Sequence, residues 1–175
     1  TWVDGVAGGT VPVDDRGLQY GDGLFETMFV RDGRVRFLEA HLARLALGCT
    51  RLAIPFKVAD TLRVELTAAA ATAPMSGILK LVITRGSGRR RGYAPNESAR
   101  PRRIVTLFAA PAMGALAHAG AHLRIATHTL AENPALAGMK HLNRLDNVLA
   151  ASESDDDDIF ESLLVDAAGH LAGGT

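Results

Sequence analysis

The sequence predicts an α+β protein, because segments with strand-like and helix-like patterns follow one another along it. Residues 24–30 and 78–84 are short apolar runs rich in branched and aromatic side chains, which is typical of strands. Between them, leucines recur at helical spacing over residues 38–52 and give a helix one apolar face. No internal repeat is evident in the sequence.

Turn-forming residues separate the remaining expected elements. Asp32 and Gly33 predict a hairpin turn at residues 31–34, because such residues accept the positive φ angles of a tight turn. Residues 15–23, which are punctuated by glycines, are expected to form a loop. The other expected elements are a strand at 11–13, a helix at 61–72, strands at 104–108 and 123–127, a helix at 141–153 and a strand at 163–166.

A stretch of small residues at 115–121 indicates a flexible linker between two domains. We therefore expect an α+β domain over residues 1–112, a linker at 113–121 and a second domain over residues 122–175. A further strand that starts at His170 has no expected partner before Thr175. The sequence is therefore expected to be a fragment of a longer protein.

Charge balance and cysteine content restrict the class of protein. The 19 basic and 19 acidic side chains cancel, which argues against a nucleic acid or a membrane surface bound mainly by charge. Cys49 is the single cysteine and cannot form an internal disulfide, which fits a reducing compartment. No signal peptide, membrane span or zinc-ligand pattern is visible, so a cytoplasmic protein without a metal site is expected.

Three basic features could carry chemistry. Lys140 is one of three lysines and has small and apolar neighbours, which could desolvate its amine and free it to act as a nucleophile or base. Arg44, in the 38–52 helix, could clamp a phosphate, and the arginines at 89–91 could hold a carboxylate. Taken singly, such residues are more often solvated surface side chains, so they do not name a reaction.

Three segments in this order resemble the fold-type IV pyridoxal-phosphate (PLP) enzymes, the class of the branched-chain and D-amino-acid aminotransferases. They are D-R-G-L-Q-Y-G-D-G-L-F-E-T at 15–27, F-L-E-A-H-L-A-R-L at 37–45 and N-P-A-L-A-G-M-K-H-L-N-R-L at 133–145. Within that fold, the last segment and the R-G-S-G…R-G-Y stretch at 85–93 most resemble 4-amino-4-deoxychorismate lyases. The resemblance implies a two-domain fold in which 122–175 begins a larger, barrel-like PLP-binding domain that continues beyond Thr175.

Matching positions imply roles for six residues. Lys140 would hold the PLP cofactor and shuttle protons, and Arg44 would bind its phosphate. Thr27 would place a hydroxyl near the reacting carbon, and the pocket for the substrate's carboxylates would include Arg91, Tyr93 and Tyr20. The implied enzyme is a homodimeric, PLP-dependent lyase that converts 4-amino-4-deoxychorismate into 4-aminobenzoate and pyruvate in folate biosynthesis.

The chain departs from the family pattern at two places. Gly173 aligns with an acidic residue that, in much of the family, faces the pyridine nitrogen; its loss favours a lyase, because aromatisation lessens the need for a strong electron sink. The arginine loop is one residue longer than usual, which leaves Arg90 as an alternative to Arg91. Two other functions remain open: a branched-chain or D-amino-acid aminotransferase with the same Lys140 and Arg44, or a non-catalytic fragment or binding module, which the abrupt ending favours.

Overall fold

The computed structural model describes residues 1–73, 75–88, 92–95, 99–111 and 119–175. Most of the predicted linker therefore lies outside the described residues. Within the described part of the chain, no helix is both long and apolar enough to cross a membrane.

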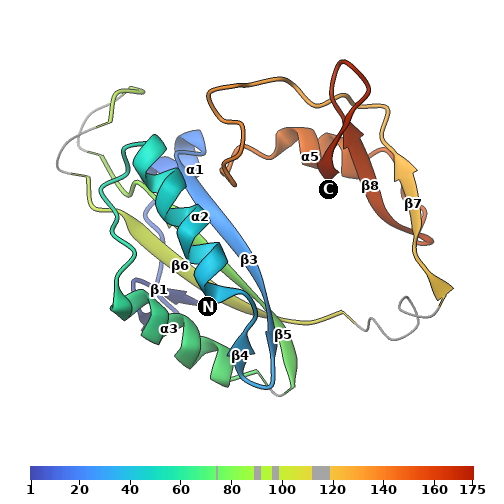
Figure 1. Ribbon diagram of the computed structural model, residues 1–175. Helices are drawn as coiled ribbons and strands as arrows, with labels where there is room; N and C mark the ends of the chain where they lie inside the picture. Colours follow the sequence, from blue (N-terminus) through green and yellow to red (C-terminus); the bar gives the residue numbers. More distant parts are fainter. Residues whose placement is uncertain (74, 89–91, 96–98, 112–118) are drawn as a thin grey trace. The chain divides into compact units, whose positions relative to one another are not determined.

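The chain divides into two compact units (Figure 1). The first unit contains Thr1–Pro111 together with Gly138–Leu142, and the second contains Ala112–Ala137 and Asn143–Thr175. The short segment Gly138–Leu142 thus packs with the first unit, although it is separated from it in sequence. This placement determines where the candidate site forms.

The first unit is a six-stranded antiparallel sheet with two long helices. Its strand order is β2-β1-β6-β5-β3-β4. The strands are β1 (Trp2–Val3), β2 (Val6–Ala7), β3 (Gly23–Arg31), β4 (Arg34–Val35), β5 (Ser76–Thr84) and β6 (Arg102–Ala109). The helices are the short α1 (Arg16–Tyr20), α2 (Leu38–Arg51) and α3 (Asp60–Ala71).

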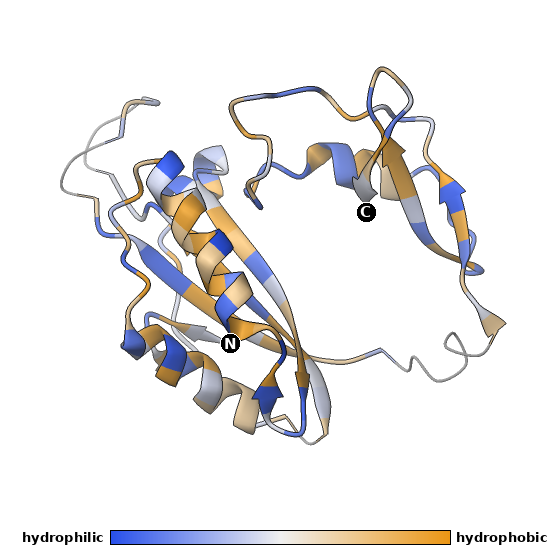
Figure 2. Ribbon diagram, viewed as in Figure 1, coloured by the Kyte–Doolittle hydropathy of each residue, from blue (hydrophilic) through white to orange (hydrophobic). Residues whose placement is uncertain are grey.

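Helices α2 and α3 pack on one face of this sheet and leave the other face more open. Successive strand residues point to opposite faces, so the buried residues of β3 alternate with exposed ones. The covered face and its helices form an apolar core that includes Met28, Leu42, Leu45, Leu66, Leu79, Leu81 and Ile83. On the open face Phe29, Ile78 and Phe108 are aligned across three strands, and both phenylalanines are exposed. Figure 2 shows hydrophobic stretches along α2 and along the strands of this sheet.

The second unit is built on a three-stranded sheet in the order β7-β8-β9. Strand β7 (His122–Ile125) runs parallel to β8 (Ile159–Val165), and β9 (Leu171–Gly174) runs antiparallel to β8. Helix α5 (Leu145–Ala151) contributes Ala150 to a small core with Ala126 and Leu164.

Most predicted elements are confirmed. The helices predicted at 38–52 and 61–72 are α2 and α3, and the strands predicted at 24–30, 78–84, 104–108, 123–127 and 163–166 correspond to β3, β5, β6, β7 and β8. The predicted turn joins β3 to β4, with φ angles of 51° at Asp32 and 69° at Gly33. Positive φ at both positions is the geometry that the Asp-Gly pair indicated.

The prediction for residues 11–23 was wrong in two places. Residues 11–13 are not a strand; the Asp15 amide donates to the Pro12 carbonyl and closes a turn instead. The expected loop contains α1, whose N-terminus is capped by the Asp15 side chain on the Gly17 amide. A five-residue helix has too little periodicity to be visible in a sequence, and its glycine favours a loop interpretation.

The predictions around Lys140 and at the C-terminus were also wrong. The helix expected at 141–153 begins only at Leu145, and His141 instead forms an antiparallel bridge with Leu24 of β3. The final strand does have a partner, because β9 pairs with β8. The bridge at His141 joins segments more than 100 residues apart, which local patterns do not report. The final strand pairs instead with its neighbour in sequence, Val165 with Leu171.

Glu153 makes the second unit sensitive to acid. Hydrogen bonds from the Thr127 hydroxyl and amide and from the His128 amide lower the pKa of Glu153 to about 2. A depressed pKa stabilises the fold above the unfolded value of about 4.3, and this stabilisation is lost as the pH falls toward 2. We expect Glu153→Gln to lower the melting temperature at pH 7 but hardly at pH 2. Calorimetry against pH tests this, with exposed Glu132→Gln as the control; equal losses at both pH values would contradict it.

Candidate functional site

Lys140 lies on an extended segment at the edge of the six-stranded sheet. The Phe25 amide donates to the Lys140 carbonyl at 2.9 Å, and the Leu142 amide donates to the Gly23 carbonyl at 3.0 Å. β4 pairs with Val30 and Arg31 on the same edge of β3, so β3 carries the lysine segment at one end and β4 at the other. Backbone pairing to a central strand holds the Lys140 main chain rigidly, which a surface loop would not.

Gly23 permits this pairing. A Cβ atom at this position would lie 2.4 Å from the Ile83 carbonyl oxygen and 2.7 Å from Leu142 Cδ1. Both distances are shorter than real Cβ contacts allow, and the first involves backbone that cannot move aside. The glycine that precedes the L-F-E-T run is therefore needed for close approach of both neighbours of β3.

The Lys140 amine lies against the open face of the sheet. Its Nζ is 4.4 Å from the centroid of the Phe25 ring, and Lys80 Nζ is 5.4 Å from the same ring. Thr27 is exposed, points to the same face as Phe25 and is directly paired with Lys80 of β5. The structure thus brings together two sequence-predicted residues, Lys140 and Thr27, and adds Lys80.

Arg44 approaches the next residue of β3 from the covered face. Its Nε donates to Glu26 Oε1 at 2.8 Å and its Nη2 donates to Oε2, while His41 Nδ1 lies 2.7 Å from Oε2. Glu26 is buried, with its side chain 1% exposed, whereas the Arg44 side chain is 46% exposed. The hydrogen bond to Glu26 raises the pKa of Arg44, which therefore remains charged.

Tyr20 and Tyr93 form a second group. Their ring centroids are 5.4 Å apart in an edge-to-face arrangement, and Arg16 Cζ is 4.9 Å from the Tyr20 ring. Arg16 Nη1 and Nη2 donate to the Gly92 and Tyr93 carbonyls and fix the end of the arginine loop. The other predicted substrate residue, Arg91, and its alternative Arg90 lie outside the described residues.

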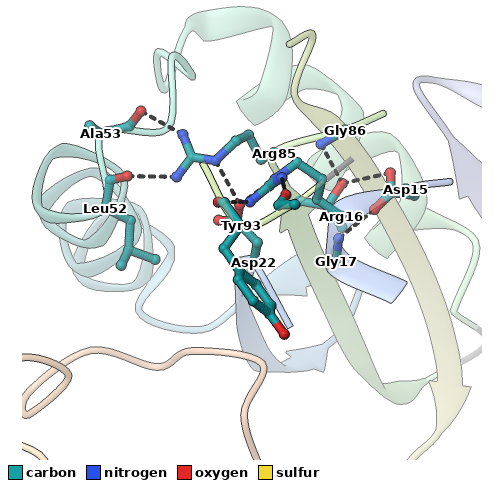
Figure 3. A network of polar contacts seen from close by, with 11 residues as sticks. Asp15, Arg16, Gly17, Asp22, Leu52, Ala53, Arg85, Gly86 and Tyr93 are labelled. Atoms are coloured by element: carbon teal, nitrogen blue, oxygen red, sulfur yellow. Dashed lines mark hydrogen bonds and ion pairs between the residues drawn. The ribbon is translucent and has the colours of Figure 1, made fainter. Parts of the chain in front are cut away.

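A buried ionic network supports this second group (Figure 3). Asp22 Oδ2 accepts from Arg16 Nε at 2.8 Å and from Arg85 Nε at 2.7 Å, and Arg85 also donates to the Leu52 and Ala53 carbonyls. Burial would raise the pKa of Asp22, but the hydrogen bonds from Arg85 and Arg16 outweigh it and hold the pKa below its usual value. The network joins the C-terminal end of α2 to α1 and to the arginine loop.

The arrangement fits a phosphorylated aldehyde such as PLP. A rigidly placed amine could form the covalent attachment, and a half-exposed guanidinium with two of its nitrogens already committed could take a phosphate on its remaining edge. Gly173, on β9 of the second unit, pairs with Leu164 of β8, and a Cβ atom at Gly173 would have no neighbour within 4 Å.

Lys80 and Glu26 were missed by the sequence interpretation. Lys80 interrupts the apolar run at 78–84, and Glu26 interrupts the run at 24–30. A charged residue within an otherwise apolar strand can be recognised in the sequence. The face of the sheet to which its side chain points, however, depends on the register of the strand. The register of β3 with β5 pairs Thr27 with Lys80, and only that pairing identifies the lysine as a neighbour of the site.

Comparisons with known proteins identify relatives in the enzyme class that the sequence motifs resemble. An aminodeoxychorismate lyase from Vibrio harveyi is 33% identical over 97% of this chain and 62% of its own length. The structure of a 4-amino-4-deoxychorismate lyase from Pseudomonas aeruginosa is 48% identical with a TM-score of 0.90, and the match covers 99% of this chain and 63% of that one. The branched-chain amino acid aminotransferase of Escherichia coli shares the fold, with a TM-score of 0.80 at 20% identity.

The chain therefore spans a little over three fifths of the length of these relatives. The family model for amino-transferase class IV matches residues 23–175, which include β3, α2 and the lysine segment. The predicted fold-type IV architecture is confirmed by this match and by the structural neighbours. The chain belongs to the amino-transferase class IV family.

Proposed function

We propose that the full-length protein is a PLP-dependent lyase that converts 4-amino-4-deoxychorismate into 4-aminobenzoate and pyruvate. The observation that carries the proposal is the position of the Lys140 amine, 4.4 Å from the Phe25 ring and on the same sheet face as Thr27 and Lys80. The Pseudomonas lyase is 48% identical to this chain, whereas a putative branched-chain aminotransferase from Methanocaldococcus jannaschii is 30% identical. The higher identity to the lyase supports lyase over aminotransferase chemistry.

Arg44 and Lys140 would hold the cofactor at its phosphate and at its aldehyde. Because Arg44 contacts β3 from the covered face and Lys140 from the open face, the cofactor would lie across the edge of β3, between the lysine segment and β4. When bound, PLP supplies a conjugated ring that accepts an electron pair from the substrate. The protein's own contribution is to orient the substrate and to move protons. Lys140 is anchored by β3 on one side and presents its amine to the open face, where a substrate can reach it.

Lys140 acts as the base. Its amine takes the proton from the ring carbon that carries the amino group, the ring becomes aromatic, and the carbon–oxygen bond to the enolpyruvyl group breaks. The leaving group takes up one proton at its methylene carbon and becomes pyruvate. The Thr27 hydroxyl, exposed on the same face, would relay that proton from Lys140.

Lys80 is proposed to bind a carboxylate of the substrate, together with Arg91 and Tyr93. It is exposed, and its amine shares the Phe25 ring with Lys140. We expect Lys80→Met to raise KM about tenfold to a hundredfold, since a hydrogen bond to a charged group is lost, while PLP binding is unchanged. Steady-state kinetics test this, with exposed Lys57→Met as the matched control; an unchanged KM would remove Lys80 from the substrate site.

Product analysis tests the reaction itself. Full-length protein with PLP and 4-amino-4-deoxychorismate should release 4-aminobenzoate and pyruvate in equal amounts without any keto acid. Amino-group transfer that requires a keto acid, with no 4-aminobenzoate, would replace the proposal by an aminotransferase. No reaction and no bound PLP would assign the chain to a binding module.

A homodimer and a cytoplasmic location belong to the same proposal, and so does a role in folate synthesis. The exposed Phe29 and Phe108 on the open face support a covering subunit, because contiguous apolar surface favours association. Sedimentation of the full-length protein tests the dimer: a monomer at all concentrations would contradict it.

A further inference from the structure

Glu26 occupies an unusual position for a carboxylate. It points to the covered face of β3, with Leu24, Met28 and Val30 as the other side chains of that strand on the same face, and its side chain is 1% exposed. An ionised carboxylate in such surroundings needs ionic partners and hydrogen bonds to offset its loss of hydration. Arg44 and His41 supply them.

The contact with Glu26 holds the Arg44 guanidinium in one orientation. Nε and Nη2 both face the Glu26 carboxylate in a two-point arrangement, which fixes the plane of the group as well as its position. His41 lies one helical turn before Arg44 on α2 and lies 2.7 Å from the carboxylate oxygen that Nη2 contacts. The carboxylate is therefore held from two points on the same helix.

We propose that Glu26 is a positioning residue, which orients the Arg44 guanidinium so that its remaining edge meets the cofactor phosphate. The inference rests on the proposed role of Arg44 as the phosphate ligand. A free arginine side chain has many rotamers and loses them when it binds an anion, whereas Arg44 has already lost them in the folded protein.

The sign of the electrostatic effect makes this inference testable. Glu26 is the counter-ion of Arg44 and would lie close to a phosphate bound by that arginine, so removal of its charge alone can only strengthen the attraction for the anion. Loss of orientation has the opposite effect. A weaker phosphate interaction in a variant without the carboxylate therefore reports lost positioning, and not lost charge.

Binding of PLP and of pyridoxal, which lacks the phosphate, separates the two contributions in the full-length protein. We expect Glu26→Leu to lower the affinity for PLP about tenfold, because the Arg44 side chain must then be ordered on binding. The affinity for pyridoxal should be unchanged. Glu26→Gln keeps an acceptor for Arg44 and should restore PLP affinity to within about threefold of the wild type. Glu39→Leu, at an exposed glutamate of α2 that pairs with Arg63, is the control and should change neither affinity.

Each outcome decides the question. If Glu26→Leu kept the wild-type preference for PLP over pyridoxal, the inference would be overturned and the proposed function would remain intact. The same holds if Glu26→Gln lost as much PLP affinity as Glu26→Leu. In an Arg44→Met background, Glu26→Leu should have no further effect on the ratio of the two affinities; a further tenfold loss there would overturn it too. A wild type that binds PLP no better than pyridoxal would instead contradict the proposed role of Arg44.

Discussion

Lys140→Ala is expected to reduce lyase turnover of the full-length protein by at least about a hundredfold, since a positioned acid–base group contributes about 10²–10⁴ in rate. The lysine is also the proposed attachment point of the cofactor, so the variant should yield no pyridoxyl adduct at position 140 after reduction with borohydride. Mass spectrometry of the wild type should find the adduct on Lys140 alone.

The remaining lysines provide the controls for this experiment. Lys57→Ala changes an exposed residue and should retain full turnover and the adduct at Lys140. Lys80 lies near the same Phe25 ring and is a chemically plausible competitor for an aldehyde. An adduct scattered over Lys57 and Lys80, or none at all, would contradict the assignment of Lys140 even if the protein were active.

The fold of the first unit was largely predictable because its strands and long helices bury one apolar face each. The apolar runs at 24–30 and 78–84, rich in branched and aromatic residues, and the leucines of α2 carry that information in the local sequence. The strands β1 and β2 have two residues each, which is too few for any period to be visible. β1 pairs with β6, just over 100 residues away in sequence, and β2 pairs in turn with β1.

The candidate site was predictable in its residues more than in its geometry. Family resemblance pointed to Lys140, but local sequence favoured a helix from His141, and a helix would have turned the lysine away from β3. The actual partner of this segment is Gly23–Phe25, more than 100 residues earlier, and such pairing depends on burial and close approach rather than on intrinsic preference.

Glu26 illustrates the limit of residue-by-residue interpretation. In the sequence it is a polar interruption of an apolar run, and nothing local distinguishes it from a solvent-facing strand residue. The alternation with exposed Thr27 places it inside, and α2 then has to supply its counter-charges. The H-L-A-R spacing of His41 and Arg44 is therefore matched to a residue on a different element.

Asp22→Asn is expected to give the largest loss of stability among single substitutions near the site. Arg16 and Arg85, with side chains 6% and 7% exposed, share its carboxylate, and removal of the charge leaves two buried cations without their counter-ion. Breaking a buried ion pair in this way costs about 3 kcal/mol or more. For a chain of this size, that corresponds to a fall of roughly 6–12 °C in melting temperature.

The pH dependence of this loss distinguishes charge from shape. The folded pKa of Asp22 is depressed, so its stabilising contribution is present above the unfolded value of about 4 and disappears as the pH falls through the lower folded value. The difference in melting temperature between wild type and Asp22→Asn should therefore be large at pH 7 and should disappear in strong acid. Asp32→Asn removes an exposed ion pair with Arg31, worth less than about 1 kcal/mol, and is the matched control. A pH-independent gap would show that the amide disturbs packing, and that the two arginines do not depend on the charge of Asp22.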